Sequence, residues 1–303
     1  MTLVCEDWRT ASDALVQSLI STESQRWLDD LGWDVRASWA VLGPARKSGL
    51  LHGFIARDSN GAVTGWTCFL AHGDTMQVAI LVSNDAATTG ALVDGILQSD
   101  AAKAAAGSMF FVREAPGLEA SLGQVQFTVS RYRYLTRKVA ERLAGSSGDT
   151  VGTRPFKDTD EGHLPGLLQV AYADSTQPRP FAPSGSLGEW RDYAGQLLKR
   201  TDVGVFRPDV SAVATHGRGK PRGFAIVTEL GPKTFHLAQI AVDPQSQRRG
   251  TARMLLDAVV QRAAAAGGES LTLLVSADNA PAVAFYESTE FTDVGAFVLG
   301  TRR

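Results

Sequence analysis

Cysteine is scarce in this chain, and its scarcity excludes several classes of protein. Only two cysteines, Cys5 and Cys68, occur among 303 residues, so the chain cannot carry a disulfide framework. The sequence contains no Cys-x-x-Cys pair and no His/Cys cluster with the spacing of a zinc site, and we therefore expect no metal site. Neither cysteine lies near a histidine in a nucleophile-like motif, so we expect no covalent cysteine intermediate.

Long apolar runs and an excess of charge are also lacking. No stretch of about 18 apolar residues occurs, and the N-terminal residues MTLVCEDWRTASD lack the basic region and apolar core of a signal peptide. The sequence therefore predicts a cytoplasmic protein that does not bind a membrane. The formal charge of −2 argues against a general role in binding nucleic acid.

The remaining composition is that of an ordinary globular protein. Hydrophobic residues make up 44% of the chain and charged residues 20%, which is enough apolar material for a large core. A length of 303 residues suits two domains of about 150 residues each. No heptad pattern or exposed apolar stripe stands out, so the oligomeric state is left open.

The clearest local pattern is a strand followed by a basic turn and a helix. The segment from Phe235 to Val242 alternates and is rich in apolar residues, as strands are. Asp243 and Pro244 end it, because proline cannot donate to a strand ladder. The turn from Gln247 to Ala252 follows, and apolar residues then recur at helical spacing. Since a helix N-terminus presents unpaired backbone N–H groups, this turn is suited to an anion such as a pyrophosphate.

This stretch resembles the acetyl-CoA-binding motif of the GCN5-related N-acetyltransferases (GNAT family), written Gln/Arg-x-x-Gly-x-Gly/Ala. Gln247, Gly250 and Ala252 occupy the three motif positions. No Gly-Lys-Ser/Thr follows, as a Walker loop requires, and the glycine spacing is not that of a Rossmann fingerprint. The resemblance implies that the turn binds the pyrophosphate of acetyl-CoA, and that backbone groups of the preceding strand hold the thioester carbonyl and the pantetheine arm. The cofactor-binding residues that it implies here are Ile240, Ala241, Val242, Gln247, Arg248, Arg249, Gly250, Thr251, Ala252 and Arg253.

A later segment, from Asn279 to Glu287, is similar to the second motif of the same family. The resemblance implies that Asn279, Ala282 and Phe285 contact the cofactor. It also implies that Tyr286 lies against the cofactor and acts as the general acid that protonates the departing thiolate. A structural tyrosine at a helix end is the alternative for Tyr286. The chain departs from the family at Glu290, where members commonly have glycine before the aromatic residue.

The general base is less clearly indicated. His236 lies four residues before Ile240 in the cofactor strand, and the ordinary pKa of histidine, near 6.5, suits a base at neutral pH. Glu229, at the end of the preceding strand, is a second candidate, and ordered water is a third. A partly buried, structural role is the alternative for His236.

In the family that the chain resembles, acceptor specificity comes from the helix-loop-helix region ahead of the strands. An aromatic wall with acidic groups would suit a cationic amine, but the same residues could simply pack two helices together. Gln239 could line the substrate side or be a polar core residue, and tryptophans of the first half could contribute to a cleft. The residues concerned are Tyr172, Asp174, Arg179, Phe181, Glu189, Trp190, Asp192 and Tyr193, with Trp33, Trp39 and Trp66 from the first half.

The expected elements occur in a similar order twice along the chain. In the first half we expect a helix over residues 3–30, a hairpin of 52–57 and 63–70 around Asn60-Gly61, a strand over 75–82, a helix over 88–104, a strand over 108–112 and strand-like residues 124–135. In the second half we expect a strand at 154–156, helices over 161–172 and 187–198, strands over 211–215, 223–229, 235–242 and 270–276, a short helix over 280–286 and a final strand pair near 292–299.

This order resembles two GNAT folds in tandem, each an α/β fold with a mixed sheet. We expect a degenerate domain over residues 1–145 and a catalytic domain over 151–303, joined by the Gly/Ser-rich segment from Ala144 to Gly152. In the first half Gly90 could match Gly250, but Leu92 stands at the position of Ala252, and Asp85 would place negative charge near a pyrophosphate. We therefore expect no strong acyl-CoA binding there; an unrelated α/β domain is the alternative.

Together these patterns predict an acetyl-CoA-dependent N-acetyltransferase that transfers an acetyl group to a primary amine of an unidentified acceptor by direct attack in a ternary complex. One alternative is a non-catalytic module that binds or senses acyl-CoA. Another is a protein acetyltransferase that acts on lysine or on an N-terminal amine.

Overall fold

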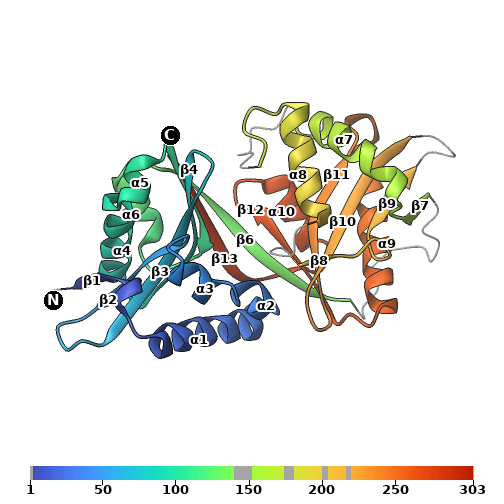
Figure 1. Cartoon of the computed structure of the whole chain (residues 1–303). Helices are drawn as coiled ribbons and strands as arrows, with labels where there is room; N and C mark the ends of the chain where they lie inside the picture. Colours follow the sequence, from blue (N-terminus) through green and yellow to red (C-terminus); the bar gives the residue numbers. More distant parts are fainter. Residues whose placement is uncertain (1–2, 140–151, 174–180, 200–203, 216–219, 303) are drawn as a thin grey trace.

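One continuous sheet runs through the whole molecule. The computed structural model describes residues 3–139, 152–173, 181–199, 204–215 and 220–302 (Figure 1). Within these residues the sheet has 13 strands in the order β1-β2-β3-β4-β5-β13-β6-β12-β11-β10-β9-β7, and β8 pairs with β10. The pairs β4–β5 and β11–β12 are parallel and the other pairs are antiparallel, which confirms the predicted α/β fold with a mixed sheet.

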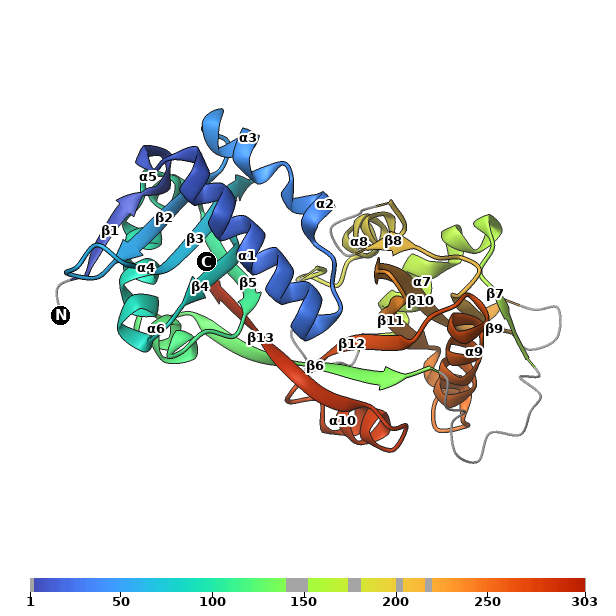
Figure 2. The same cartoon turned by 90° about the horizontal axis from the view of Figure 1, so that it is seen from below.

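Two lobes lie side by side, and β6 and β13 cross between them (Figures 1 and 2). We call β1 to β5 with their helices the first lobe, together with α6, which comes after β5. Its elements, in chain order and ending with the next strand, are β1 Val4–Asp7, η1 Trp8–Thr10, α1 Asp13–Leu31, α2 Arg36–Trp39, α3 Leu42–Lys47, β2 His52–Arg57, β3 Val63–His72, β4 Thr75–Ser83, α4 Ala86–Gln98, α5 Asp100–Ala104, β5 Gly107–Arg113, α6 Leu118–Gln124 and β6 Thr128–Lys138.

The second lobe consists of β7 to β12 with the helices among them, together with α10. Its elements, ending with the last strand, are β7 Thr153–Pro155, η2 Asp158–His163, α7 Leu164–Ala171, α8 Leu187–Lys199, β8 Val205–Phe206, β9 Ala212–Thr215, β10 Pro221–Gly231, β11 Thr234–Val242, η3 Pro244–Ser246, α9 Thr251–Ala265, β12 Ser270–Ser276, α10 Ala280–Glu287 and β13 Thr292–Arg302.

The two middle strands are exchanged between the lobes. Strand β6 comes after the first lobe in sequence but pairs with β12 of the second, from Ser270↔Lys138 to Ser276↔Tyr132. Strand β13, the last in sequence, pairs with β5 of the first lobe and with β6. The expected pair of strands near residues 292–299 is therefore wrong: a single strand runs there, and its partners come from the first half. Residues 144–151 of the expected junction lie outside the described residues, so the division at 145/151 stays a prediction.

Each face of the sheet packs against its own set of helices. On one face, α9 and α10 cover a core that includes Leu255 and Leu273, and α4 covers a core that includes Leu92 and Phe110. On the other face, α1 packs over the first lobe and α7 and α8 over the second. Between them on this second face lies an aromatic cluster that includes Trp33 and takes residues from both lobes.

The loop after α1 docks the first lobe onto the second. Gly32 ends α1 with φ +66°, and a Cβ atom there would come within 2.8 Å of Thr234 Oγ1. Two residues later, the Asp34 N–H donates to the Leu230 carbonyl oxygen at 2.8 Å. The left-handed conformation and the close approach both require glycine at this position.

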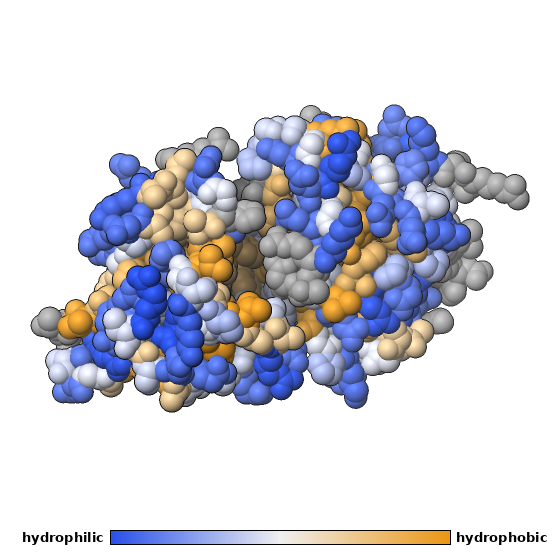
Figure 3. All heavy atoms as spheres, in the orientation of Figure 1, coloured by the Kyte–Doolittle hydropathy of each residue, from blue (hydrophilic) through white to orange (hydrophobic). Residues whose placement is uncertain are grey.

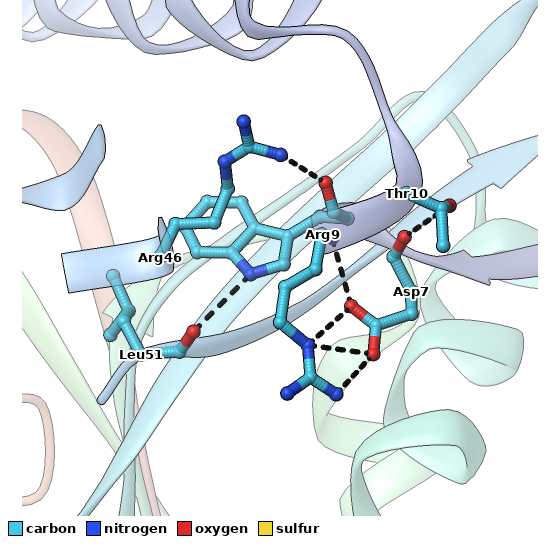
Figure 4. A network of polar contacts seen from close by, with 6 residues as sticks. Asp7, Arg9, Thr10, Arg46 and Leu51 are labelled. Atoms are coloured by element: carbon cyan, nitrogen blue, oxygen red, sulfur yellow. Dashed lines mark hydrogen bonds and ion pairs between the residues drawn. The ribbon is translucent and has the colours of Figure 1, made fainter. Parts of the chain in front are cut away.

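The N-terminal region differs from the expected helix over residues 3–30. Strand β1 comes first and pairs with β2, and α1 begins only at Asp13, after Ser12, whose hydroxyl accepts from the Leu15 N–H at 3.3 Å. Trp8 between them is buried; its Nε1–H donates to Leu51 O at 3.4 Å, and its own carbonyl accepts from Arg46 Nη1 at 2.6 Å (Figure 4). These long-range contacts hold the segment extended against the sheet.

Other expectations for the first lobe are met more closely. The hairpin of β2 and β3 is confirmed, with Gly61 at φ +80° in its turn. The expected helix over residues 88–104 is instead two helices, α4 and α5, that meet at Ser99. The backbone of Ser99 is extended and its hydroxyl accepts from the Ala102 N–H at 3.2 Å, so Ser99 ends one helix and caps the next.

Candidate functional site

The cofactor strand parts from its neighbour where the sequence predicts binding. Strand β11 pairs with β12 only over Thr234–Leu237. Opposite β10 the register shifts between Gln239 and Leu237, which leaves Ala238 as an extra residue. Beyond this bulge β11 leaves β12, and we call the opening between residues 238–242 and residues 274–276 the fork.

Backbone groups of β11 point into the fork. The carbonyl oxygens of Ile240 and Val242 accept from the side-chain amides of Gln239 at 3.2 Å and Gln247 at 3.1 Å. The N–H and C=O of one strand residue point to the same side, so the N–H groups of Ile240 and Val242 also lie on the fork side. These N–H groups can bind the carbonyl oxygen and amide groups of an extended ligand.

The turn after β11 leaves the start of α9 open. Gly250 is the N-cap residue, with φ +81°, and no side chain caps the first turn of α9. A Cβ atom built on Gly250 would meet no atom of the described residues within 4 Å, so there is space beside it in this part of the structure. Gln247, Arg248 and Arg249 are exposed on the same turn. A left-handed glycine, uncapped N–H groups and two arginines together suit a pyrophosphate.

A neighbouring carboxylate is engaged elsewhere. Asp243, at the end of β11, pairs with Arg222 Nη1 at 2.8 Å and accepts from the Gln245 N–H at 2.9 Å. It therefore caps the short helix η3 and not α9. The Thr251 hydroxyl donates to Ser246 O at 2.9 Å, which ties the beginning of α9 to this turn.

The second predicted motif, from Asn279 to Glu287, comprises the N-cap residue and all of helix α10. Asn279 is its N-cap, and its Oδ1 accepts from the Ala282 N–H at 3.3 Å. Several residues predicted to bind the cofactor are half-buried against one core, which therefore connects the first turn of α9, the fork and α10. These residues are Ile240, Ala252, Ala282 and Phe285.

Tyr286 on α10 is buried, with 6% of its surface exposed. Its ring packs against Phe285 and Phe291, with centroids 5.3 and 5.5 Å away. Burial, and to a lesser degree the nearby Tyr172, raises the pKa of Tyr286. The phenol therefore keeps its proton at neutral pH, as a proton donor must.

His236 lies in an environment that argues against the predicted role of general base. His236 is 6% exposed, and its ring stacks with both Trp33 and Tyr134, whose centroids are each 6.0 Å away. Its Nδ1 lies 2.9 Å from the Thr272 hydroxyl. Burial lowers the pKa of His236 to about 4, so it is a weak base in an enclosed site. The sequence shows the residue type but not the tryptophan that the first lobe places over it.

Glu229 is also unfavourably placed for this role. It pairs with Phe235 in the sheet, before the fork begins at Ala238. Its carboxylate forms an ion pair with Arg207 Nη1 at 2.5 Å. A carboxylate held by an arginine at the start of β11 is poorly suited to take a proton from an amine in the fork.

A hydrogen-bonded network at the fork involves residues that the sequence suggested only as possible walls. The Tyr193 hydroxyl donates to Gln239 Oε1 at 2.9 Å, and Gln239 Nε2 donates to the Tyr172 hydroxyl at 2.7 Å. Tyr132 of β6 lies near this network. Burial is the main cause that raises the pKa of Tyr132 to about 12, and the nearby Tyr172 raises this pKa further. Tyr132 was not predicted, because only the exchange of β6 brings it to the second lobe.

The expected acidic wall for a cationic acceptor is not formed by Glu189. Its carboxylate accepts from the N–H groups of Ser184 at 2.9 Å and Gly185 at 3.0 Å, so it caps the loop before α8. Asp192 is exposed on α8, and Phe181 stacks on Tyr193 at 4.9 Å. Asp174 and Arg179 lie outside the described residues. Trp66 packs on Trp8 inside the first lobe, with ring centroids 6.5 Å apart, so it is not part of a cleft.

Two general features of the described residues bear on ligands. No helix in this part of the chain is long and apolar enough to cross a membrane. Within the same residues, no group of three or more His, Cys, Asp or Glu side chains is arranged to hold a metal ion.

Comparison with known proteins shows a family to which this part of the chain is similar. Residues 171–291 match the model of the Acetyltransferase (GNAT) family. Over 67 residues the chain is 47% identical to a [Ribosomal protein bS18]-alanine N-acetyltransferase of Salmonella typhimurium. The aligned region covers 22% of this chain and 45% of that protein. The protein of the same name from Escherichia coli K12 is 41% identical over 75 residues, 25% of this chain and 50% of that protein. The chain thus spans about half the length of these curated relatives.

Solved structures resemble the whole chain in fold. A GCN5-related N-acetyltransferase from Sphaerobacter thermophilus has a TM-score of 0.65 at 15% identity, over 99% of this chain and 95% of that one. A tandem GNAT protein from the clavulanic acid biosynthesis pathway has a TM-score of 0.56 at 13% identity, over 99% and 98% of the two chains. Residues 171–291 are therefore similar to the GNAT family, and the chain as a whole has the fold of a tandem GNAT protein.

Proposed function

We propose that this protein is an N-acetyltransferase that transfers an acetyl group from acetyl-CoA to a primary amine in a ternary complex. The observation that carries the proposal is the continuity of the fork with the uncapped start of α9. One end offers backbone N–H groups to a thioester and a pantetheine arm, and the other offers N–H groups and arginines to a pyrophosphate. The match of residues 171–291 to the GNAT family model supports the same activity. A cytoplasmic location is part of this proposal.

The proposed cofactor contacts follow the order of these elements. Ile240 and Val242 would bind acetyl-CoA through backbone groups. Residues 247–253, with Gly250 at their centre, would bind its phosphates. Asn279, Ala282 and Phe285 of α10 would border the arm from the other side. The first residues of α9 fit the phosphates because, among the described residues, no side chain occupies the space around Gly250.

The chemistry requires little covalent help from the protein. A neutral amine attacks the thioester carbon, and an N–H group of the fork stabilises the negative charge on the oxygen. The C–N bond forms, the C–S bond breaks, and Tyr286 donates its proton to the departing sulfur. The amine loses one proton to water at the fork, since both His236 and Glu229 are held by other partners, and a proton from solvent then restores the Tyr286 phenol. The products are an amide and free CoA thiol.

A panel of amines with a thiol-detecting reagent tests this proposal. Amino acids, polyamines, aminoglycosides and peptides are offered with acetyl-CoA, and release of CoA thiol beyond the rate without amine is expected for at least one class. Acetyl-CoA binding measured by calorimetry, with no thiol release for any class, would favour a non-catalytic binding module instead.

A second candidate is acetylation of a protein N-terminus. It is favoured by the relatives in Salmonella and Escherichia, which are named for a ribosomal protein alanine as acceptor. Peptides with free and blocked N-termini distinguish this candidate, because only the free amine can be acetylated. Mass spectrometry of the products locates the acetyl group on the N-terminal amine or on a lysine.

A further inference from the structure

A cleft between the lobes continues the fork toward the first lobe. Figure 3 shows a hollow between the lobes with hydrophobic residues on its walls, and Figure 1 places β6 and β12 behind it. Half-buried side chains from both halves of the chain pack beside the central aromatic cluster, and their outer surfaces remain exposed. They are Trp39 of α2, Phe111 of β5, Tyr132 of β6 and Leu274 of β12.

The register of the sheet connects this cleft to the site of reaction. Tyr132 pairs with Ser276, the last residue of β12, which borders the fork. Neighbouring strands lie about 4.8 Å apart, so Tyr132 stands about one strand spacing from the edge of the fork. Phe111 contacts Tyr132 edge to face, with centroids 5.9 Å apart, and extends the aromatic surface into the first lobe.

The polar groups that the described residues bring to this end of the cleft include an amide and hydroxyls. Gln239, fixed by Tyr172 and Tyr193, forms one wall. Ser276 is 7% exposed, and its hydroxyl has no hydrogen-bond partner among the described residues. A buried hydroxyl without a partner costs free energy, so this one is suited to bind a polar atom of a ligand. Hydroxyls and an amide cannot compensate a second positive charge on an acceptor as a carboxylate would.

We propose that the acceptor is a small primary amine carried on an aromatic group, which lies in the interlobe cleft against Tyr132 and Leu274 with its amine at the fork. This inference rests on the proposed function, and it gives the first half of the chain a direct part in acceptor binding. The aromatic rings provide the contact surface, and the amine enters the fork as the neutral base.

The test compares three amines that differ in the group next to the amine: 2-phenylethylamine, hexylamine and cadaverine. We expect the lowest KM for 2-phenylethylamine. Tyr132→Leu removes the ring and should raise that KM about tenfold while the KM for acetyl-CoA is unchanged. Tyr132→Phe keeps the ring and should stay near the wild-type value. Phe54→Leu, at a half-buried phenylalanine on the opposite face of the first lobe, is the matched control and should change neither KM.

The outcomes separate the inference from the proposed function. Preference for cadaverine, or an unchanged KM for 2-phenylethylamine in Tyr132→Leu, would overturn the inference while acetyl transfer stands. If no amine releases thiol, the proposed function fails, and calorimetric titration of 2-phenylethylamine into the CoA-bound protein still decides whether the cleft binds it. Thermal melting checks that each variant folds; should Tyr132→Leu not fold, Leu274→Ala tests the same wall.

Discussion

In each lobe two parallel strands part from each other, but the connection from the strand to the next helix differs between the lobes. Strand β4 pairs with β5 only over Thr75–Val78, as β11 pairs with β12 only over Thr234–Leu237. Opposite β3 the register shifts around Ala79, which matches the extra residue Ala238 in β11. The parting of two parallel strands is therefore a property of both lobes and does not by itself make a binding site.

The connection from the strand to the next helix distinguishes the lobes. Only Asn84 and Asp85 separate β4 from α4, and Asp85 accepts from the Thr88 N–H at 2.8 Å. This hydrogen bond is the main cause that holds the pKa of Asp85 below its ordinary value, so a carboxylate stays at the start of α4. Residue Gly117 at the start of α6 also packs there, since a Cβ on it would lie 2.6 Å from Ala86 Cβ. An internal anion and a neighbouring helix occupy the space that is open at α9.

The match between Gly90 and Gly250 suggested by the sequence is wrong. Gly90 lies inside α4, whereas Gly250 is the left-handed residue before α9. Leu92 is fully buried in the core of the first lobe and does not border a turn. The comparison teaches that a longer turn and a missing cap, and not the fold, provide the capacity to bind an anion.

The largest expected effect is that of Gly250→Val. A β-branched residue at φ +81° costs roughly 1–3 kcal/mol, and its side chain enters the space proposed for the phosphates. We expect calorimetry to show acetyl-CoA affinity reduced by about a hundredfold or more. Gly267→Val is the matched control: Gly267 has φ +82° and open surroundings after the far end of α9, so the variant should lose stability and keep affinity. Equal affinity in both variants would contradict the assigned phosphate turn.

A somewhat smaller effect is expected for Tyr286→Phe. Helix α10 carries this tyrosine, whereas the corresponding α6 of the first lobe has the sequence LEASLGQ. Loss of a general acid should lower kcat roughly a hundredfold, with little change in acetyl-CoA affinity. Tyr134→Phe removes a hydroxyl that is bonded to Thr272 away from the fork, and should affect stability more than kcat. A full rate in Tyr286→Phe would exclude this residue as the acid.

The contact between the lobes at His236 should make stability depend on pH. The folded pKa of about 4 lies below the ordinary value of 6.5, so the unfolded state binds more protons in this range. Stability should therefore fall by about 3 kcal/mol as the pH drops from 7 to 4 on account of this residue. In His236→Gln, urea unfolding at several pH values should show a flatter dependence; an unchanged slope would mean that another group is responsible.

The smallest effect is expected for Asp85→Asn in the first lobe. The cap is weakened, so the melting temperature should decrease. Because the folded pKa of Asp85 is lowered, its contribution is present above about pH 4 and is lost as the pH falls through the folded value, so the difference from wild type should shrink there. Titration with acetyl-CoA should still give one site per chain, since the short connection remains. A second site in the variant would show that Asp85 alone had closed the first lobe.

Much of the second half could be predicted because its signals are local. The strand over 235–242, the turn at Gly250 and the short helix after Asn279 are each encoded within a few residues, and strand β12 has the expected bounds. The hairpin at Asn60-Gly61 is local in the same sense. The Tyr172–Gln239–Tyr193 network could be suspected only as a set of candidate walls, because it joins two helices to one strand.

The features that could not be predicted depend on distant pairings. Nothing near residue 132 indicates that β6 pairs with β12, and nothing near residue 297 indicates a partner in β5. Burial by the other lobe is equally hidden: Trp33 covers His236 from about 200 positions away in the sequence. Sequence patterns identify residue types and local elements, while tertiary contacts determine which of them remain accessible for chemistry.

The exchange of β6 and β13 also bears on how the chain matures during synthesis. Until residues 292–302 have been made, the edge of β5 has no partner from β13, and β6 awaits β12 as well. An uncovered strand edge is prone to pair with other chains. The first lobe, although translated first, can finish its sheet only after the second, so we expect slow, interdependent folding and a dependence on chaperones that neither lobe would show if its sheet closed on itself.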